Sequence, residues 1–183
     1  MPKKSKSAKP VAADPEDVCA ADDADAPKPD VSLATVRHTA VRLLARREHS
    51  RAELHGKLLL RKYAQELIGP VLDQLAERGL QCDVRFAESY TRMRVQRGYG
   101  DNKIRAELQT RSLSRDIIDD ALSVYSGEWA DKAIAALQKK FSPMQLTDSN
   151  PRELAKMQRF LWSRGYTSAD ISMALKSVRN SVK

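Results

Sequence analysis

The chain has 183 residues, of which 31% are charged and only 5% are aromatic, and its formal net charge is +8. This composition is typical of helices around thin cores, and a strand-rich fold would need more β-branched residues. No apolar run approaches the ~18 residues that a membrane span needs, and the first residues lead into no apolar segment of a secretory signal. We therefore expect a cytoplasmic protein that does not enter a membrane.

The first thirty residues differ in composition from the rest of the chain. They contain almost no large apolar side chain that would offset the entropy of ordering, so residues 1–30 are predicted to be a disordered tail. Five lysines stand against seven acidic residues there, which gives the tail a net charge of −2 and leaves +10 on residues 31–183. A cationic helical body favours an anionic partner, either nucleic acid or an assembly that nucleic acid coats.

Side chains that carry out catalysis or hold metals form no recognisable pattern. Cys19 and Cys82 have neither the spacing of a disulfide framework nor that of a metal site. The three histidines, His49 among them, lack a paired pattern of metal ligands, and we interpret them as solvated side chains. The sequence therefore predicts no enzyme, no cofactor and no metal.

Three copies of one apolar pattern follow the tail. The stretch 50–125 matches itself at a displacement of 50 residues without a gap, and a third copy follows at 103, so Leu54, Ile104 and Met157 occupy one position. Periods of this length indicate stacked helical units that cover one another's apolar faces. We therefore predict an all-α fold, an elongated array of three tandem three-helix repeats. The predicted repeats are residues 31–80, 81–127 and 128–183.

The first repeat is predicted to contain three helices. Residues 33–44 carry apolar side chains at spacings of three and four, which is the stripe of an amphipathic helix. Ser50 and Glu53 have the spacing of a capping box, in which the hydroxyl accepts from the Glu53 amide and the carboxylate reaches back. The third helix carries apolar residues over 67–75. Pro70 would remove a backbone hydrogen bond there, so this helix starts late or bends.

The second and third repeats follow the same plan. Predicted helices of the second repeat cover 83–97, 101–110 and 114–125. In the third repeat, a helix at 128–141 is followed by a longer loop that contains Pro143 and Asp148. Asn150 is a good N-cap before Pro151, and Thr167 to Asp170 marks the start of the last helix in a similar way.

Basic residues gather off the apolar stripes of the first two repeats. A run of charge often marks only a solvated face, but the summed surplus favours contacts with an anionic partner. Arg42, Arg61 and Lys62 lie in this basic group. The candidate residues for binding DNA or a DNA-coated partner are Arg46, Arg47, Arg51, Arg85, Arg92, Arg94, Arg97, Lys103, Arg105 and Arg111.

Two aromatic residues distinguish the third repeat. Phe160 and Trp162 stand where the earlier copies have Lys57 and Leu59, so aromatic rings occupy positions that tolerate other side chains elsewhere. Exposed aromatic residues often anchor a protein partner. Alternatively, the terminal repeat lacks a following neighbour and buries both rings as a cap.

Four segments carry a family resemblance. They read LLARREHSRAEL at 43–54, IGPVLDQLAERG at 68–79, DVRFAESY at 83–90 and RGYGDNKI at 97–104. With these segments the chain resembles the bacterial RecX family over nearly everything after the tail. It departs from the family pattern in the turn at 80–83 and around 110–112. These departures affect the expected geometry of the two turns.

The resemblance implies a modulator of the RecA recombinase, an elongated protein of three three-helix repeats that lies in the groove of the RecA filament on DNA. It implies a non-enzymatic inhibitor that suppresses strand exchange and ATP hydrolysis in DNA repair and the SOS response. The implied partners are the RecA filament and single- and double-stranded DNA, contacted directly or through the filament. Terminal copies that cap the array favour a monomer.

Two other functions fit the same residues. A stand-alone DNA-binding protein would place the arginines on phosphates, and its affinity for bare DNA would fall steeply with salt. A protein-docking scaffold would depend on Phe160 and Trp162 instead. The sequence leaves both alternatives open.

Overall fold

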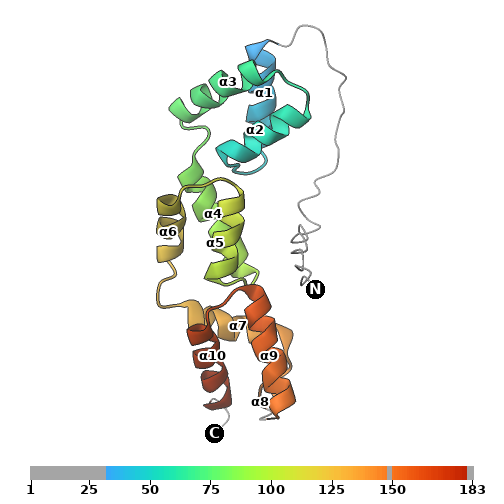
Figure 1. Ribbon diagram of the computed structural model, residues 1–183, viewed down its shortest axis with the longest axis vertical. Coiled ribbons are helices and arrows are strands. Elements are labelled where there is room, and N and C mark those ends of the chain that lie inside the picture. Colours follow the sequence, from blue (N-terminus) through green and yellow to red (C-terminus); the bar gives the residue numbers. More distant parts are fainter. Residues whose placement is uncertain (1–31, 148–149, 181–183) are drawn as a thin grey trace, which may run out of the picture.

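The structure is a computed structural model that describes residues 32–147 and 150–180, so the predicted tail lies outside the described residues. Every regular element in this part of the chain is a helix, and the helices follow one another along a rod (Figure 1). The prediction of an elongated all-α array is confirmed. The helices are α1 (Leu33–Leu44), α2 (Arg51–Leu60), α3 (Gln65–Glu77), α4 (Asp83–Gln96), α5 (Asp101–Thr110), α6 (Arg115–Ser123), α7 (Trp129–Lys140), α8 (Pro143–Thr147), α9 (Pro151–Arg164) and α10 (Ser168–Asn180).

Each third of the rod has its own apolar core. Leu54 is fully buried among α1 to α3, Ile104 among α4 to α6, and Met157 among α7 to α10. Trp129 packs against both the second and the third core, whereas the first and second cores share no side chain among the described residues. The repeats are therefore separate apolar units that meet through their surfaces.

Helix starts in the third repeat follow the predicted caps. The Asn150 side chain accepts a hydrogen bond from the Arg152 amide at 3.0 Å, and Pro151 occupies the first helical position of α9. Before α10, the Asp170 amide donates to the Thr167 hydroxyl at 3.2 Å while the Thr167 amide donates to the Asp170 carboxylate at 3.3 Å. These contacts satisfy amides that the first turn of a helix leaves without a partner.

Three details differ from the prediction. The Glu53 amide donates to the Ser50 hydroxyl at 3.1 Å, but the Glu53 carboxylate turns to other side chains instead of reaching back. The predicted loop after residue 141 contains the short helix α8, because Leu146 is buried in the third core. Of the two alternatives for the third helix, a late start is wrong, because α3 begins at Gln65 and contains Pro70.

The middle helix of every repeat is followed by a residue with a left-handed backbone. Lys62, Ser112 and Gly165 occupy the same position in the three repeats, with φ angles of 61°, 59° and 86°. A side chain strains this conformation because its Cβ approaches the neighbouring carbonyl oxygen, whereas glycine adopts it freely. The first two repeats therefore keep a strained turn that the third builds with glycine.

Replacing Ser112 by glycine is expected to stabilise the protein by about 1 kcal/mol. Relief of a left-handed strain of ~1–2 kcal/mol exceeds the entropy that glycine adds to the unfolded chain. Urea denaturation of Ser112→Gly and of Lys62→Gly measures the effect. The control makes the reverse change at Gly79, which has a φ of 65° and no atom within 4 Å of an added Cβ: Gly79→Ser should destabilise the protein. Variants no more stable than the parent would mean that the strain is absent.

Candidate partner-binding surface

The first and second repeats meet through polar groups. The Ser50 hydroxyl donates to the carbonyl oxygen of Arg111 at 3.2 Å, and Arg111 Nε donates to Glu53 Oε1 at 2.9 Å. The Arg51 amide donates to the carboxylate of Asp83, at the start of α4, at 2.8 Å. Since the two cores on either side share no described side chain, these hydrogen bonds and ion pairs hold the junction.

Glu53 is the centre of this junction. Its carboxylate is 15% exposed and lies 2.9 Å from His49 Nδ1 and 3.1 Å from Arg47 Nη1. Burial opposes the charged form, but the hydrogen bond of His49 and the charges of Arg47 and Arg111 outweigh it and lower the pKa of Glu53 to about 2. His49 itself is 3% exposed. The prediction of a solvated histidine is therefore wrong, because the carboxylate four residues later gives the buried ring a partner.

The second and third repeats meet through their backbones. The Gly100 amide donates to the carbonyl oxygen of Arg164 at 2.9 Å, and the Asn102 amide donates to that of Gly165 at 3.2 Å. A Cβ added to Gly100 would lie 2.6 Å from the Gly165 oxygen, and one added to Gly165 would lie 2.5 Å from the Lys103 Cβ. Glycine is required at both positions, because the two backbone segments approach too closely to leave room for a side chain.

Both junctions use the same helix ends. Ser50 and Gly100 are the N-caps of α2 and α5, while Arg111 and Arg164 stand at the C-terminal ends of α5 and α9. The N-terminal ends of α2 and α5 therefore meet the C-terminal ends of α5 and α9, and opposite poles of the helix dipoles face each other. The middle helices α2, α5 and α9 are joined head to tail along the rod.

Arginine and tyrosine side chains connect the two junctions through the second repeat. The Arg111 guanidinium lies 4.5 Å from the centre of the Tyr90 ring. The guanidinium groups of Arg94 and Arg164 lie 3.8 Å and 4.5 Å from the centre of the Tyr99 ring. The contact of the buried Arg94 is worth about 2 kcal/mol, and those of the half-buried Arg111 and Arg164 are worth about 1 kcal/mol each. These arginines therefore contribute to the packing between repeats.

The structure divides the ten candidate basic residues into three groups. Arg94 is buried and Arg111 is half-buried, and they pair with Glu107 and Glu53. The pairing with a carboxylate gives both arginines a structural role, and their contact with a partner stays a prediction. Four candidates form ion pairs at the surface: Arg47 with Glu53, Arg51 with Asp73, Arg85 with Glu48 and Arg105 with Asp119. The remaining four are the exposed Arg46, Arg92 and Arg97 and the half-buried Lys103.

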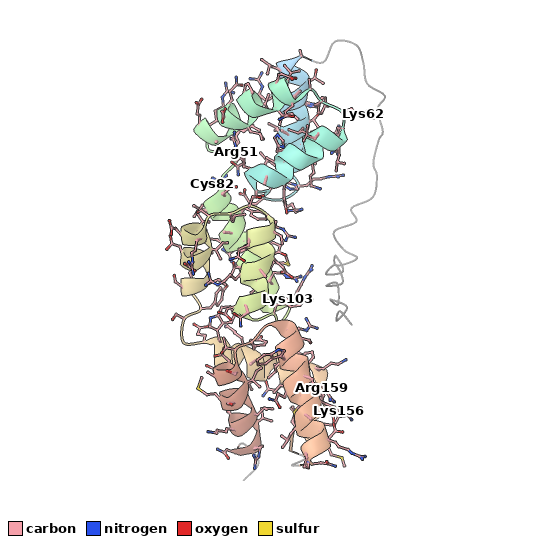
Figure 2. The ribbon with its side chains drawn as sticks, viewed as in Figure 1. Arg51, Lys62, Cys82, Lys103, Lys156 and Arg159 are labelled. Carbon is pink, nitrogen blue, oxygen red and sulfur yellow. The ribbon has the colours of Figure 1, made fainter. Side chains whose placement is uncertain are left out.

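Cations from all three repeats lie along one edge of the rod. Figure 2 shows Lys62, Lys103, Lys156 and Arg159 on this edge, within or just after the middle helices. Lys62, Lys156 and Arg159 are exposed, and Lys156 pairs with Glu153 at 2.6 Å. Lys156 and Arg159 were not among the predicted contacts, although Lys156 occupies the repeat position of Lys103 and that equivalence was a usable signal. We call these four residues the basic edge.

The two aromatic residues of α9 have different surroundings. Phe160 is half-buried against the third core, with its ring edge-on to Phe141 at 5.7 Å and the Arg164 guanidinium 5.3 Å from its centre. Trp162 is 63% exposed. The capping interpretation therefore describes Phe160, while the Trp162 ring faces solvent.

Metal-ligating side chains are scattered over residues 32–147 and 150–180. No three histidine, cysteine, aspartate or glutamate side chains gather there in a way that would hold a metal ion. Cys82 is a free, half-buried thiol at the N-cap of α4. In the same part of the chain, every helix is too short or too polar to cross a membrane.

Models of the first, second and third three-helix domains of RecX match residues 37–75, 83–122 and 128–175. A "Regulatory protein RecX" of Chromohalobacter salexigens is 45% identical over 143 residues, 78% of this chain and 91% of that protein. The Pseudomonas fluorescens protein of the same name is 43% identical over 144 residues, 79% and 92% of the two chains. The crystal structure of RecX from Lactobacillus salivarius has the same fold, with a TM-score of 0.69 at 22% identity, over 80% of this chain and 96% of that one. The chain belongs to the RecX family of regulatory proteins.

Proposed function

We propose that this protein inhibits the RecA recombinase by binding along the groove of the RecA–DNA filament, where it suppresses strand exchange and ATP hydrolysis without performing a reaction. Membership of a family of regulatory proteins supports a regulatory role. The observation that carries the proposal is the basic edge, because it extends over all three repeats of a rod (Figure 2). Such an edge suits a long groove with DNA and acidic groups nearby, and the proposal implies a cytoplasmic monomer.

The rod shape explains how inhibition proceeds without catalysis. Lys62 follows the middle helix of the first repeat and Arg159 lies in that of the third, so a partner that contacts both must extend along the protein. When several weak charge contacts lie on one rigid body, their binding free energies add. The entropy of association is lost only once, when the first contact forms. A protein held in this way would occupy the space through which the second DNA strand must enter.

Titrating the protein into RecA on single-stranded DNA is expected to lower the rate of ATP hydrolysis. Arg159→Glu should weaken this inhibition about fivefold, since reversing an exposed charge at a contact is worth about 1 kcal/mol. Arg115→Glu is the matched control, because Arg115 is an exposed arginine on α6, away from the basic edge. Unchanged hydrolysis at saturating amounts of the unaltered protein would reject the proposal.

A stand-alone DNA-binding function is the second candidate. Trp162 and Arg159 lie three residues apart on α9 and are both exposed, so a ring and a cation share one helix face. This pair suits the stacking of an unpaired base beside a phosphate. Affinity for bare single-stranded DNA, measured over a series of salt concentrations, separates the two functions. A filament binder prefers the RecA-coated strand, whereas a DNA binder holds the bare strand equally well.

A further inference from the structure

The C-terminal end of α2 is equivalent to the C-terminal ends of α5 and α9, and a neighbouring repeat docks on each of those two. We call such a helix end a docking edge. Arg61, Arg111 and Arg164 hold the same repeat position at the ends of the three middle helices. The carbonyl oxygen of Arg111 accepts from the Ser50 hydroxyl, and that of Arg164 accepts from the Gly100 amide. Among the described residues, no group donates to the carbonyl oxygen of Arg61. The first copy of the edge is therefore open.

The Arg61 side chain already has a hydrogen bond that Arg111 makes in its occupied junction. Nη1 of each arginine donates to the carbonyl oxygen four residues earlier, at 3.2 Å for Lys57 and 2.9 Å for Glu107. In Arg111, this arrangement leaves Nε to bind the Glu53 carboxylate at 2.9 Å. Arg61 Nε has no carboxylate among the described residues. The side chain is thus held in place for an acidic group that these residues do not supply.

The surroundings of Arg61 favour a protein partner over a nucleic acid. Leu60 is 83% exposed, whereas the other two repeats place Thr110 and Ser163 at this position. Together with the neighbouring Leu59, which is 39% exposed, Leu60 gives a protein partner apolar area to cover. The carbonyl oxygen of Arg61 can accept a hydrogen bond from a protein donor, whereas a phosphate group supplies only acceptors.

We propose that the end of α2 docks the N-terminal end of a helix of the RecA filament, with a carboxylate of that helix's first turn bound by Arg61. This inference rests on the proposed function. Both occupied copies of the edge bind the N-terminal end of a helix, and in the first of them Glu53 is a first-turn carboxylate. The capping group or a first amide of the partner helix donates to the Arg61 carbonyl oxygen. The dipoles of the two helices then align as they do in both internal junctions.

The test compares variants of the full chain for binding to RecA-coated single-stranded DNA. Arg61→Met should weaken binding about tenfold, because a charge-assisted hydrogen bond is lost together with its geometry. Arg61→Lys should weaken it nearly as much, since lysine has no Nε–H to point at the carboxylate. Arg78→Met is the matched control: it removes an exposed arginine at the C-cap of α3 in the same repeat, and affinity should stay within about twofold.

Other outcomes identify other occupants. Unaltered affinity of Arg61→Met, with the same thermal midpoint as the parent, would overturn the docking proposal while leaving the proposed function in place. Full affinity of Arg61→Lys, or an equal loss on bare DNA, would show that the arginine serves a phosphate through charge alone. Self-association of the parent that Arg61→Met abolishes would assign the edge to a second copy. A parent that fails to bind the filament removes the proposed function first, and this inference with it.

Discussion

Gly100→Ala is expected to lower the free energy of unfolding by about 2 kcal/mol and to loosen the third repeat from the second. The added Cβ would lie 2.6 Å from the carbonyl oxygen of Gly165 and from the amide nitrogen of Tyr166. Both are backbone atoms, so relief requires breaking the hydrogen bond between Gly100 and Arg164. Overpacking of this kind costs about 1–3 kcal/mol. The φ of Gly100 is −89°, so the loss is steric and owes nothing to backbone strain.

Urea denaturation measures the loss, and hydrogen exchange at the Asn102 amide reports opening of the junction, because this amide donates across it. Gly56→Ala is the matched control. It makes the same chemical change inside α2, where no atom lies within 4 Å of the new Cβ, and should stabilise the protein by up to about 1 kcal/mol. Equal stability of Gly100→Ala and the parent would contradict the close approach of the two backbones.

Glu53→Gln is expected to destabilise the protein by about 3 kcal/mol at neutral pH. The change removes the anion that pairs with Arg47 and Arg111, and Arg111 loses the carboxylate that holds it across the first junction. Breaking a buried ion pair on one side costs about 3–5 kcal/mol, and the partial exposure of Glu53 places the loss at the lower limit. Glu77→Gln, at an exposed glutamate at the end of α3, is the control and should change stability by less than about 0.5 kcal/mol.

The same carboxylate is expected to make stability depend on pH in acid. The pKa of Glu53 is lowered from 4.5 to about 2, so its ionised form stabilises the folded state fully above pH 4.5. This contribution, about 2 kcal/mol after allowance for solvent screening, is lost as the pH falls through 2. Urea denaturation from pH 6 to pH 2 should therefore show a steeper decline for the parent than for Glu53→Gln. Parallel profiles would mean that the carboxylate titrates normally.

The repeat architecture was predictable from the sequence because it depends on apolar periodicity alone. Leu54, Ile104 and Met157 mark one buried position in three copies, and each copy must cover its apolar face. Helix starts at Asn150 and Thr167 were predictable for a similar reason, since the capping groups lie within three residues of the amides that they serve. Local spacing decides both features.

The structural roles of Arg94 and Arg111 were not predictable, because they depend on partners far along the chain. Arg111 binds Glu53, which lies 58 residues away, and Arg94 pairs with Glu107, which lies 13 residues away on another helix. Periodicity assigns every arginine off the apolar stripe to solvent. In the sequence, Arg61 and Arg111 occupy equivalent positions, and only the fold shows that one edge is occupied while the other is open among the described residues.

The separation of the first core from the second affects how the protein unfolds. Helices α1 to α3 share no described core side chain with α4, whereas Trp129 joins the second core to the third. Cooperativity should therefore be weaker at the first boundary than at the second, and denaturation should proceed in more than one stage. A substitution that melts α1 to α3 would leave α4 to α10 folded. Such a substitution would shorten the surface that contacts the partner, and the second and third repeats would stay bound.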